Sequence, residues 1–248
     1  MEKRFKTMMI LAVVFILTGI STTTYAEDTK PIHLYSRTIT LSPDSKMNSS
    51  TLGKANIENY NLSDKEFTLD VYDDNGVTVY SVDADDENYR ESAMEYVNML
   101  TGDSKHEAQL SGLLKPGQSE YHNDTQFDGN AKSYAWKKNT ASSTGNNFIG
   151  GQASLWLGSG SCDYIVLNQN INVSGFGVSI SWPPSVSGNG KSGSWQSQPI
   201  YKDVASASFK GFYVSGTAFS CSFTENGDVY KGGRIYRPVT YIKFSYFS

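Results

Sequence analysis

The sequence predicts a mostly β protein, an antiparallel sandwich or barrel, with a smaller α/β N-terminal part that contains one or two helices. Three observations support this fold class. Short runs rich in aromatic and β-branched residues recur through the second half of the 248-residue chain, separated by Gly, Ser and Asn. Two Asn-Gly pairs lie between alternating apolar residues, as in tight hairpins. One stretch of the first half repeats apolar residues at helical spacing.

The strand-like runs fill most of residues 131–248, and several short strands with turn signals between them favour a sandwich or a barrel. Within this part, Asn226-Gly227 predicts a two-residue hairpin, since both residue types adopt the positive φ that a type I′ turn needs. The runs lie at 133–138, 153–159, 163–173, 175–182, 207–216, 219–233 and 239–247.

One of these regions, residues 205–223, contains a single charged residue. Together with residues 166–181 it resembles in composition the amphipathic hairpins of β-pore-forming toxins, which alternate lipid-facing and lumen-facing side chains. However, Phe212, Tyr213 and Val214 are consecutive, and such a trio suits a fully packed strand. We therefore interpret residues 205–223 as a core strand, with the pore-forming hairpin as the alternative.

The first half of the chain contains a second hairpin signal. Asn75-Gly76 predicts a type I′ turn. Pairing outward from that turn sets Leu69 opposite Val82 on one apolar face. The turn residues and the apolar pattern agree, so the sequence predicts both the hairpin and its register.

A helix is predicted directly after this hairpin, over residues 83–102. Acidic residues lie at its start, where the helix dipole favours them. Apolar residues follow at helical spacing, and Gly102 can end the helix. A second short helix is predicted over residues 104–114.

Residues 1–26 have the pattern of a secretory signal peptide. A basic start precedes an apolar run over residues 8–20, and Thr24-Tyr25-Ala26 fits a cleavage site after Ala26. The apolar run is shorter than the ~20 residues that a transmembrane helix needs. The sequence therefore predicts a secreted, extracellular protein with no stable transmembrane segment in the mature chain.

Charge divides the mature chain near residue 130. Residues 27–131 contain twenty acidic and eight basic residues, and residues 132–248 contain four acidic and ten basic residues. All four tryptophans lie in the basic part. We expect an acidic α+β region at 27–130 and a basic, Trp/Tyr-rich β region at 131–248. One sheet that runs from an acidic to a basic end is the equally weighted alternative.

The two cysteines, Cys162 and Cys221, predict a disulfide, since an even number in an exported chain favours pairing. No zinc site is expected, because they lie far apart with no histidine near either. An acidic cluster suggests calcium, but it does not fit an EF-hand loop, and we interpret it as a helix start with a solvated turn. We therefore predict no metal and no cofactor. The cluster comprises Asp70, Asp73, Asp74, Asp83, Asp85 and Asp86.

The composition favours a non-enzymatic extracellular binding protein whose ligand is a glycan or another cell-envelope component. Trp182, which precedes two prolines, and Trp195, in a Gly/Ser-rich segment, are the candidate ligand-binding residues. We expect both to be exposed in loops, where aromatic rings can stack on a ligand. The acidic net charge of −4 disfavours nucleic acid as a partner. A β-pore-forming or other secreted toxin is the alternative.

A third, more weakly indicated function is enzymatic. The motif TAFSC at 217–221 resembles the T-L-x-T-C strand end of sortases, and Arg234 follows Cys221 across a turn, as a sortase arginine does. The resemblance covers this segment only and implies an exported β-barrel cysteine transpeptidase. Two motif positions differ, and no histidine lies between His122 and Cys221 to act as the base that a thiol needs.

Overall fold

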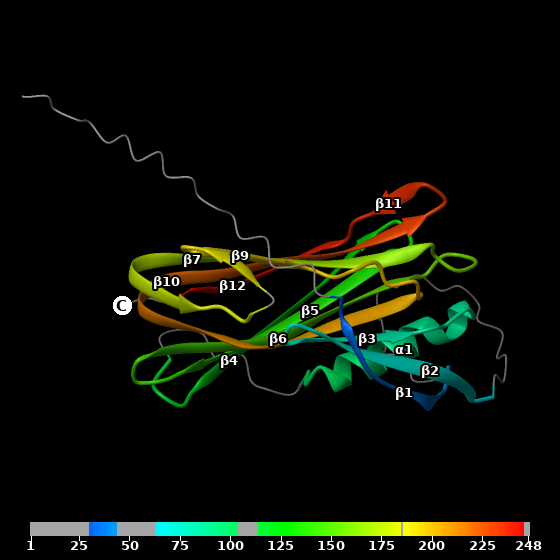
Figure 1. The fold of residues 1–248 in the computed structure, drawn as a ribbon, viewed down its shortest axis with the longest axis horizontal. Helices are drawn as coiled ribbons and strands as arrows, with labels where there is room; N and C mark the ends of the chain where they lie inside the picture. Colours follow the sequence, from blue (N-terminus) through cyan, green and yellow to red (C-terminus); the bar gives the residue numbers. More distant parts are fainter. Residues whose placement is uncertain (1–29, 44–62, 104–113, 185, 246–248) are drawn as a thin grey trace, which may run out of the picture.

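The computed structural model describes residues 30–43, 63–103, 114–184 and 186–245, and these fold as antiparallel β-structure with one helix (Figure 1). The predicted fold class is confirmed: the protein is mostly β, with a small helical element near its N-terminal side. The elements are, in chain order, β1 (Ile32–Leu41), β2 (Lys65–Asp74), β3 (Val77–Val82), α1 (Glu87–Leu100), β4 (Ser119–Asp128), β5 (Ala131–Ala141), β6 (Gly145–Trp156), β7 (Tyr164–Ser181), β8 (Ser187–Asn189), β9 (Ser192–Gln196), β10 (Val204–Lys231), β11 (Arg234–Tyr236) and β12 (Val239–Ser245).

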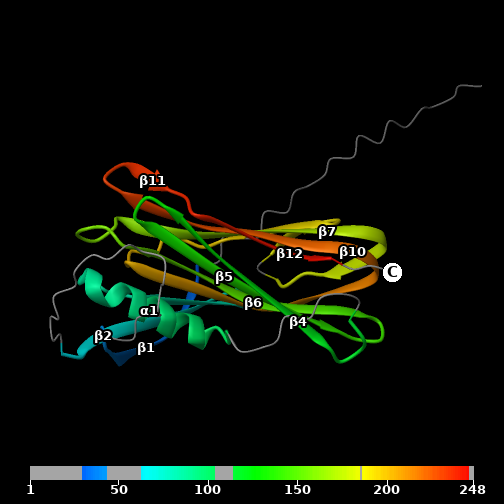
Figure 2. The same cartoon turned by 180° about the vertical axis from the view of Figure 1, so that it is seen from behind.

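These strands form one hydrogen-bonded sheet that curls into two layers (Figures 1 and 2). The first layer has the order β1-β2-β3-β10-β6-β5-β4. The second layer contains β8, β9, β7, β10 and β12, with β11 beside the end of β10. Residues 204–215 of β10 pair with β6 in the first layer, and residues 213–230 pair with β7 in the second. The long strand β10 therefore joins the two layers covalently.

At its β-bulges, strand β10 changes which face of the sheet its alternate side chains point to. Gly211 and Gly216 have φ values of +54° and +90°, which favour glycine. The register with β6 shifts between Phe209 and Phe212, so that both rings point into the core although they are three residues apart. This extra residue explains why the alternation breaks near residue 212. The interpretation of residues 205–223 as a core strand is confirmed.

Helix α1 covers the outer face of the first layer and forms one core there. Its buried face, which includes Tyr89, Ala93 and Val97, packs against Leu69 and Leu155 of the sheet. A separate set of apolar side chains fills the space between the two layers. The order in space is therefore helix, first layer, second layer.

The helix lies where the spacing of apolar residues predicts it. Asp86 is its N-cap and accepts a hydrogen bond from the backbone N–H of Asn88 at 3.1 Å. Gly102 follows the C-terminus with a φ of +89°, as predicted. The second predicted helix, over 104–114, lies almost entirely outside the described residues.

The β2–β3 hairpin is confirmed in both its turn and its register. Asn75 and Gly76 have φ values of 51° and 93°, as a type I′ turn requires. Leu69 lies opposite Val82, as predicted. Local sequence chemistry was sufficient here, because the turn residues and the apolar faces demand the same pairing.

The hairpin predicted at Asn226-Gly227 is wrong. Strand β10 continues through both residues, and the chain turns instead at Gly232-Gly233, with φ values of 60° and 77°. Position 227 has a glycine because the two layers pack too closely there to leave room for a side chain. A Cβ at this position would lie 1.8 Å from Oγ of Ser154 on β6, so the glycine makes room for a neighbouring strand.

The charge boundary near residue 130 falls at the turn between β4 and β5. Two strand pairings cross it, because β4 pairs with β5 and β3 pairs with β10. The acidic strands thus continue into the same sheet as the basic ones. Among the described residues, no helix is both long and apolar enough to cross a membrane. The predicted signal peptide, residues 1–26, lies outside the described residues.

Candidate functional site

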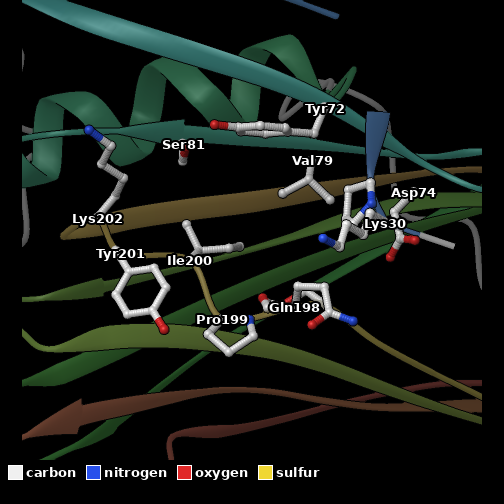
Figure 3. Close-up of a pocket in the computed structure, with 12 residues that line it drawn as sticks. Lys30, Tyr72, Asp74, Val79, Ser81, Gln198, Pro199, Ile200, Tyr201 and Lys202 are labelled. Atoms are coloured by element: carbon white, nitrogen blue, oxygen red, sulfur yellow. Dashed lines mark hydrogen bonds between the residues drawn. The ribbon is translucent and has the colours of Figure 1, made fainter. Parts of the chain in front are cut away.

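A groove with a cavity volume of about 560 Å³ lies at the open edge of the space between the layers (Figure 3). Strands β2 and β3 form one wall, and the segment 197–202 between β9 and β10 forms the other. Its volume is in the usual range of small-molecule sites. The lining residues are Lys30, Pro31, Tyr72, Asp74, Val79, Ser81, Ser197, Gln198, Pro199, Ile200, Tyr201 and Lys202.

The hairpin register brings the first wall together. Tyr72 of β2 lies directly opposite Val79 of β3, and opposite residues of an antiparallel pair share one face of the sheet. Asp74 and Ser81 lie on the same face, because each is two residues away from one of this pair. This is the face that looks toward the second layer, where Tyr72 and Val79 pack with the inter-layer core.

The second wall is attached to β7 by backbone hydrogen bonds. Ile200 and Ile165 exchange N–H···O bonds of 2.8 Å in both directions, and the N–H of Ser197 donates to the Leu167 carbonyl at 2.9 Å. Figure 3 shows Pro199 and Ile200 facing the Tyr72 side of the groove. The backbone of this wall is therefore fixed.

Tyr201 is the most accessible ring of the groove, since 72% of its surface is exposed. It also lies near Tyr164 of β7, with ring centroids 5.7 Å apart. An exposed ring on a fixed backbone can contact a ligand without a rearrangement of the chain. The sequence offers a weak signal for it, because Tyr201 follows a proline between two strand-like runs, as loop residues do.

Lys202 lies at one end of the groove, and Lys30 and Asp74 lie at the other (Figure 3). Nζ of Lys202 lies 2.9 Å from Oδ2 of Asp83. At the other end, burial raises the pKa of the Asp74 carboxyl, and the hydrogen bond from Trp195 opposes that rise. Burial, reinforced by the nearby Asp70, also raises the pKa of Tyr72, whose hydroxyl therefore stays protonated at neutral pH.

The prediction that Trp182 and Trp195 are both exposed is wrong. Trp195 is buried at 5% exposure, and its Nε1–H donates to Oδ2 of Asp74 at 3.1 Å. Trp182 is half-buried and stacks on Phe212, with ring centroids 5.3 Å apart. The Gly/Ser-rich segment that looked like a loop is strands β8 and β9, where glycine gives the Trp182 ring room. Trp195 thus supports the groove from behind.

The predicted disulfide is also wrong, because Cys162 and Cys221 are both free. Cys221 lies opposite Val173 in the sheet, and Cys162 lies just before Tyr164 at the far end of β7. The nine residue steps from 164 to 173 span about 30 Å at the usual rise of a strand. A disulfide needs Cα atoms within about 7 Å. Sequence spacing could not reveal that Cys162 precedes one end of the β7–β10 pairing while Cys221 lies in its middle.

The two residues that carry the sortase resemblance are not brought together. Arg234 pairs with Lys231, ten residues along β10 from Cys221, which is about 33 Å of strand. Cys221 is completely buried, and burial raises its thiol pKa far above neutral pH. Burial also raises the pKa of Cys162 to about 12. Neither cysteine carries the thiolate that nucleophilic catalysis requires.

A buried ion pair lies in the core between the layers. Nζ of Lys137 on β5 is 2.6 Å from Oε1 of Glu225 on β10, and both side chains are only 2% exposed. Gln169 on β7 donates to the same carboxylate. Burial lowers the pKa of Lys137 and raises the pKa of Glu225. Both shifts favour the neutral form, because the buried site disfavours a charge without its partner. Both side chains belong to the packed interior, so the role of this pair is structural.

Comparison of the chain with protein-family models, with curated proteins and with solved structures gave no match. The chemistry of the groove therefore has to be derived from its own residues.

Proposed function

We propose that this protein is a non-enzymatic binding protein whose ligand occupies the groove between the β2–β3 hairpin and the segment 197–202. One observation carries the proposal: a volume of about 560 Å³ with apolar and aromatic walls and a few convergent polar groups. Ligand sites in proteins combine these two features, since apolar contact supplies affinity and polar groups supply orientation.

A glycan or another hydroxyl-rich component of a cell envelope is the ligand class that suits these walls. The faces of Tyr72 and Tyr201 offer flat apolar contact for the C–H side of a sugar ring. The Asp74 carboxylate offers an acceptor for sugar hydroxyls, and Gln198 and Lys202 line the same groove with polar side chains. The predicted signal peptide agrees with a ligand outside the cell.

The ionisable groups of the groove favour binding over catalysis. Asp74 accepts a hydrogen bond from Trp195, and Lys202 is paired with Asp83. Asp74 and Lys202 are thus each held by a partner rather than poised to exchange a proton with a ligand. We therefore propose recognition without turnover.

The test is a glycan array with the mature chain, residues 27–248, followed by calorimetry on the best hit. Tyr201→Ala should weaken binding about tenfold, a loss of about 1.4 kcal/mol, since it removes the exposed ring. Tyr241→Ala is the matched control, because Tyr241 is 54% exposed on β12, away from the groove. Equal losses in both variants, or none in Tyr201→Ala, would contradict the proposal.

A β-pore-forming toxin remains the second candidate, and one observation favours it. Strand β7 alternates exposed Asn and Ser with buried Ile and Val along residues 170–174, while it pairs with β10. An amphipathic strand pair of this kind is what a membrane barrel needs. Leakage of dye from lipid vesicles tests it directly: rapid release by the mature chain would favour the toxin, and intact vesicles would favour the binding protein.

A further inference from the structure

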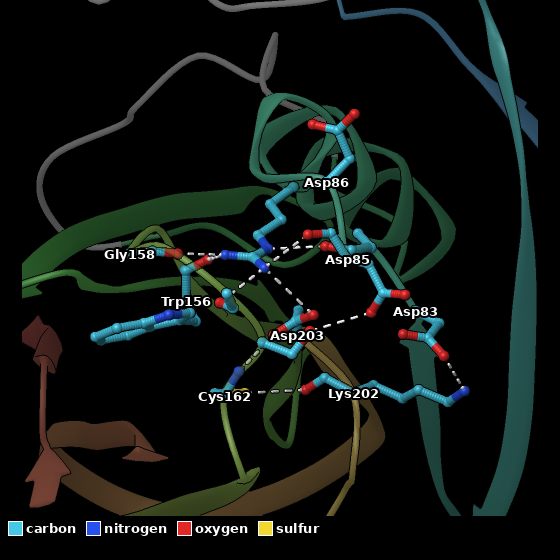
Figure 4. Close-up of polar contacts among 12 residues, drawn as sticks. Asp83, Asp85, Asp86, Trp156, Gly158, Cys162, Lys202 and Asp203 are labelled. Atoms are coloured by element: carbon cyan, nitrogen blue, oxygen red, sulfur yellow. Dashed lines mark hydrogen bonds and ion pairs between the residues drawn. The ribbon is translucent and has the colours of Figure 1, made fainter. Parts of the chain in front are cut away.

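Three carboxylates converge at the junction between β3, α1 and β10, a short distance from the groove (Figure 4). Asp83 and Asp85 follow β3, and Asp203 directly precedes β10. One carboxylate oxygen from each lies within 4.8 Å of the others. We call these three residues the carboxylate cluster. Acidic residues alone do not make a site, so the state of each oxygen matters.

The nearest permanent cation is already fully engaged by backbone carbonyls. Arg90 of α1 is completely buried, and a guanidinium has five N–H donors. All five are used: Nε donates to the Ala84 carbonyl, Nη1 to those of Trp156 and Gly158, and Nη2 to those of Asp85 and Gly160. Arg90 therefore holds the loops of this junction together and has no N–H left for a carboxylate.

Asp203 is left with a buried oxygen that no donor reaches. Its side chain is 1% exposed, and its Oδ1 accepts the N–H of Cys162 at 2.8 Å. Its Oδ2 has no hydrogen-bond partner, although the Arg90 guanidinium lies 3.5 Å away. The ion pair with Arg90 offsets charge at this oxygen but does not supply the hydrogen bond or coordination that a buried carboxylate oxygen needs. This oxygen is the second, independent sign of a ligand.

The other two carboxylates have lone pairs to spare. Asp85 accepts one hydrogen bond, from the Ser161 hydroxyl at 3.1 Å, and Asp83 is paired with Lys202 at 2.9 Å. The three negative charges exceed the two positive charges of Arg90 and Lys202 by one. The cluster thus favours an additional cation that can be coordinated by oxygen.

We infer that Asp83, Asp85 and Asp203 form a binding site for a hard divalent cation of the Ca²⁺ class. Carboxylate oxygens are the ligands that Ca²⁺ prefers, and water can complete its coordination at this half-open position. Zinc is disfavoured, because it prefers thiolate and imidazole ligands and the three ligands of this cluster are all carboxylates. The site does not depend on a ligand in the groove.

A bound cation would join the acidic and basic parts of the chain. Asp83 and Asp85 belong to the acidic part, and Asp203 starts the strand that connects the two layers. Bound Ca²⁺ would also compete with Lys202 for Asp83, and Lys202 lines the groove. The sequence could not show this site, because its third carboxylate lies far along the chain from the other two.

The test measures Ca²⁺ binding to the EDTA-treated protein by calorimetry and by the melting temperature, with Mg²⁺ and Zn²⁺ in parallel. Asp85→Asn should weaken Ca²⁺ binding at least about tenfold, since it removes one charged ligand. It preserves the acceptor for Ser161, so the fold should persist. Lys202→Gln should strengthen Ca²⁺ binding about threefold, because it removes the competing ammonium from Asp83.

Glu87→Gln is the matched control, because it removes another exposed carboxylate two residues along the chain, outside the cluster. It should leave Ca²⁺ binding unchanged. Three results would overturn the inference: no heat and no rise in melting temperature at about 5 mM Ca²⁺, equal losses in Asp85→Asn and Glu87→Gln, or preferential binding of Zn²⁺.

Discussion

Two lysine–carboxylate pairs in this protein have similar distances and very different surroundings. Lys137 and Glu225 lie 2.6 Å apart between the layers, with both side chains 2% exposed. Lys202 and Asp83 lie 2.9 Å apart at the edge of the molecule, with side chains 26% and 48% exposed. Removal of one buried partner leaves an uncompensated charge, whereas water readily replaces a partner at the surface. The interior pair should therefore govern stability, and the edge pair is free to exchange partners.

The largest effect should come from the interior pair. Lys137→Met leaves Glu225 buried without its cation, and we expect a loss of about 3–5 kcal/mol in the free energy of unfolding, measured by urea denaturation. The double variant Lys137→Met/Glu225→Leu should recover most of this loss, because it leaves no buried charge. If the double variant is as unstable as the single one, packing rather than charge determines the stability of this site.

The pH dependence of Lys137→Met sharpens the same point. Burial raises the pKa of Glu225 in the folded protein, and the loss of Lys137 should raise it further. A folded state with a raised carboxyl pKa takes up a proton more readily than the unfolded chain. The deficit of Lys137→Met relative to wild type should therefore shrink as the pH falls from about 7 to about 5. A deficit that does not change over this range would contradict this account.

An intermediate effect is expected where the interior meets the groove. Trp195→Phe keeps a buried ring and removes the N–H that Asp74 accepts, so unfolding should become easier by about 0.5–1.5 kcal/mol. That hydrogen bond favours the carboxylate form, so its loss should raise the pKa of Asp74, measurable by NMR titration. The stability difference should disappear at acidic pH, where Asp74 is protonated in both proteins. A difference that persists there would assign the effect to ring packing.

The smallest effect should come from the edge pair. Lys202→Gln should change the free energy of unfolding by less than about 1 kcal/mol, since the pair is partly solvated. Added salt should weaken even this contribution. A loss comparable to that of Lys137→Met would abolish the distinction between the two pairs.

Local chemistry accounts for what the sequence could predict. The Asn75-Gly76 turn and the presence of α1 depend on residues within a few positions, so their signals were sufficient, although the helix begins at Glu87 rather than at residue 83. Asn226-Gly227 carries the same turn signal and lies in a strand. The difference is tertiary, because Gly227 in the second-layer part of β10 packs closely against Ser154 of the first layer.

The sequence by itself determined the fold class, one hairpin with its register, and the helix, because turn residues and apolar spacing act locally. Only the tertiary structure decided which distant residues meet. It placed Cys162 at one end of the β7–β10 pairing and Cys221 in its middle, and it buried Trp195 behind Asp74. It also brought Tyr201 beside the β2–β3 wall and Asp203 beside Asp85. These contacts depend on how β10 bends and which strands it pairs with, and bulges and long-range pairing leave few signals in the local sequence.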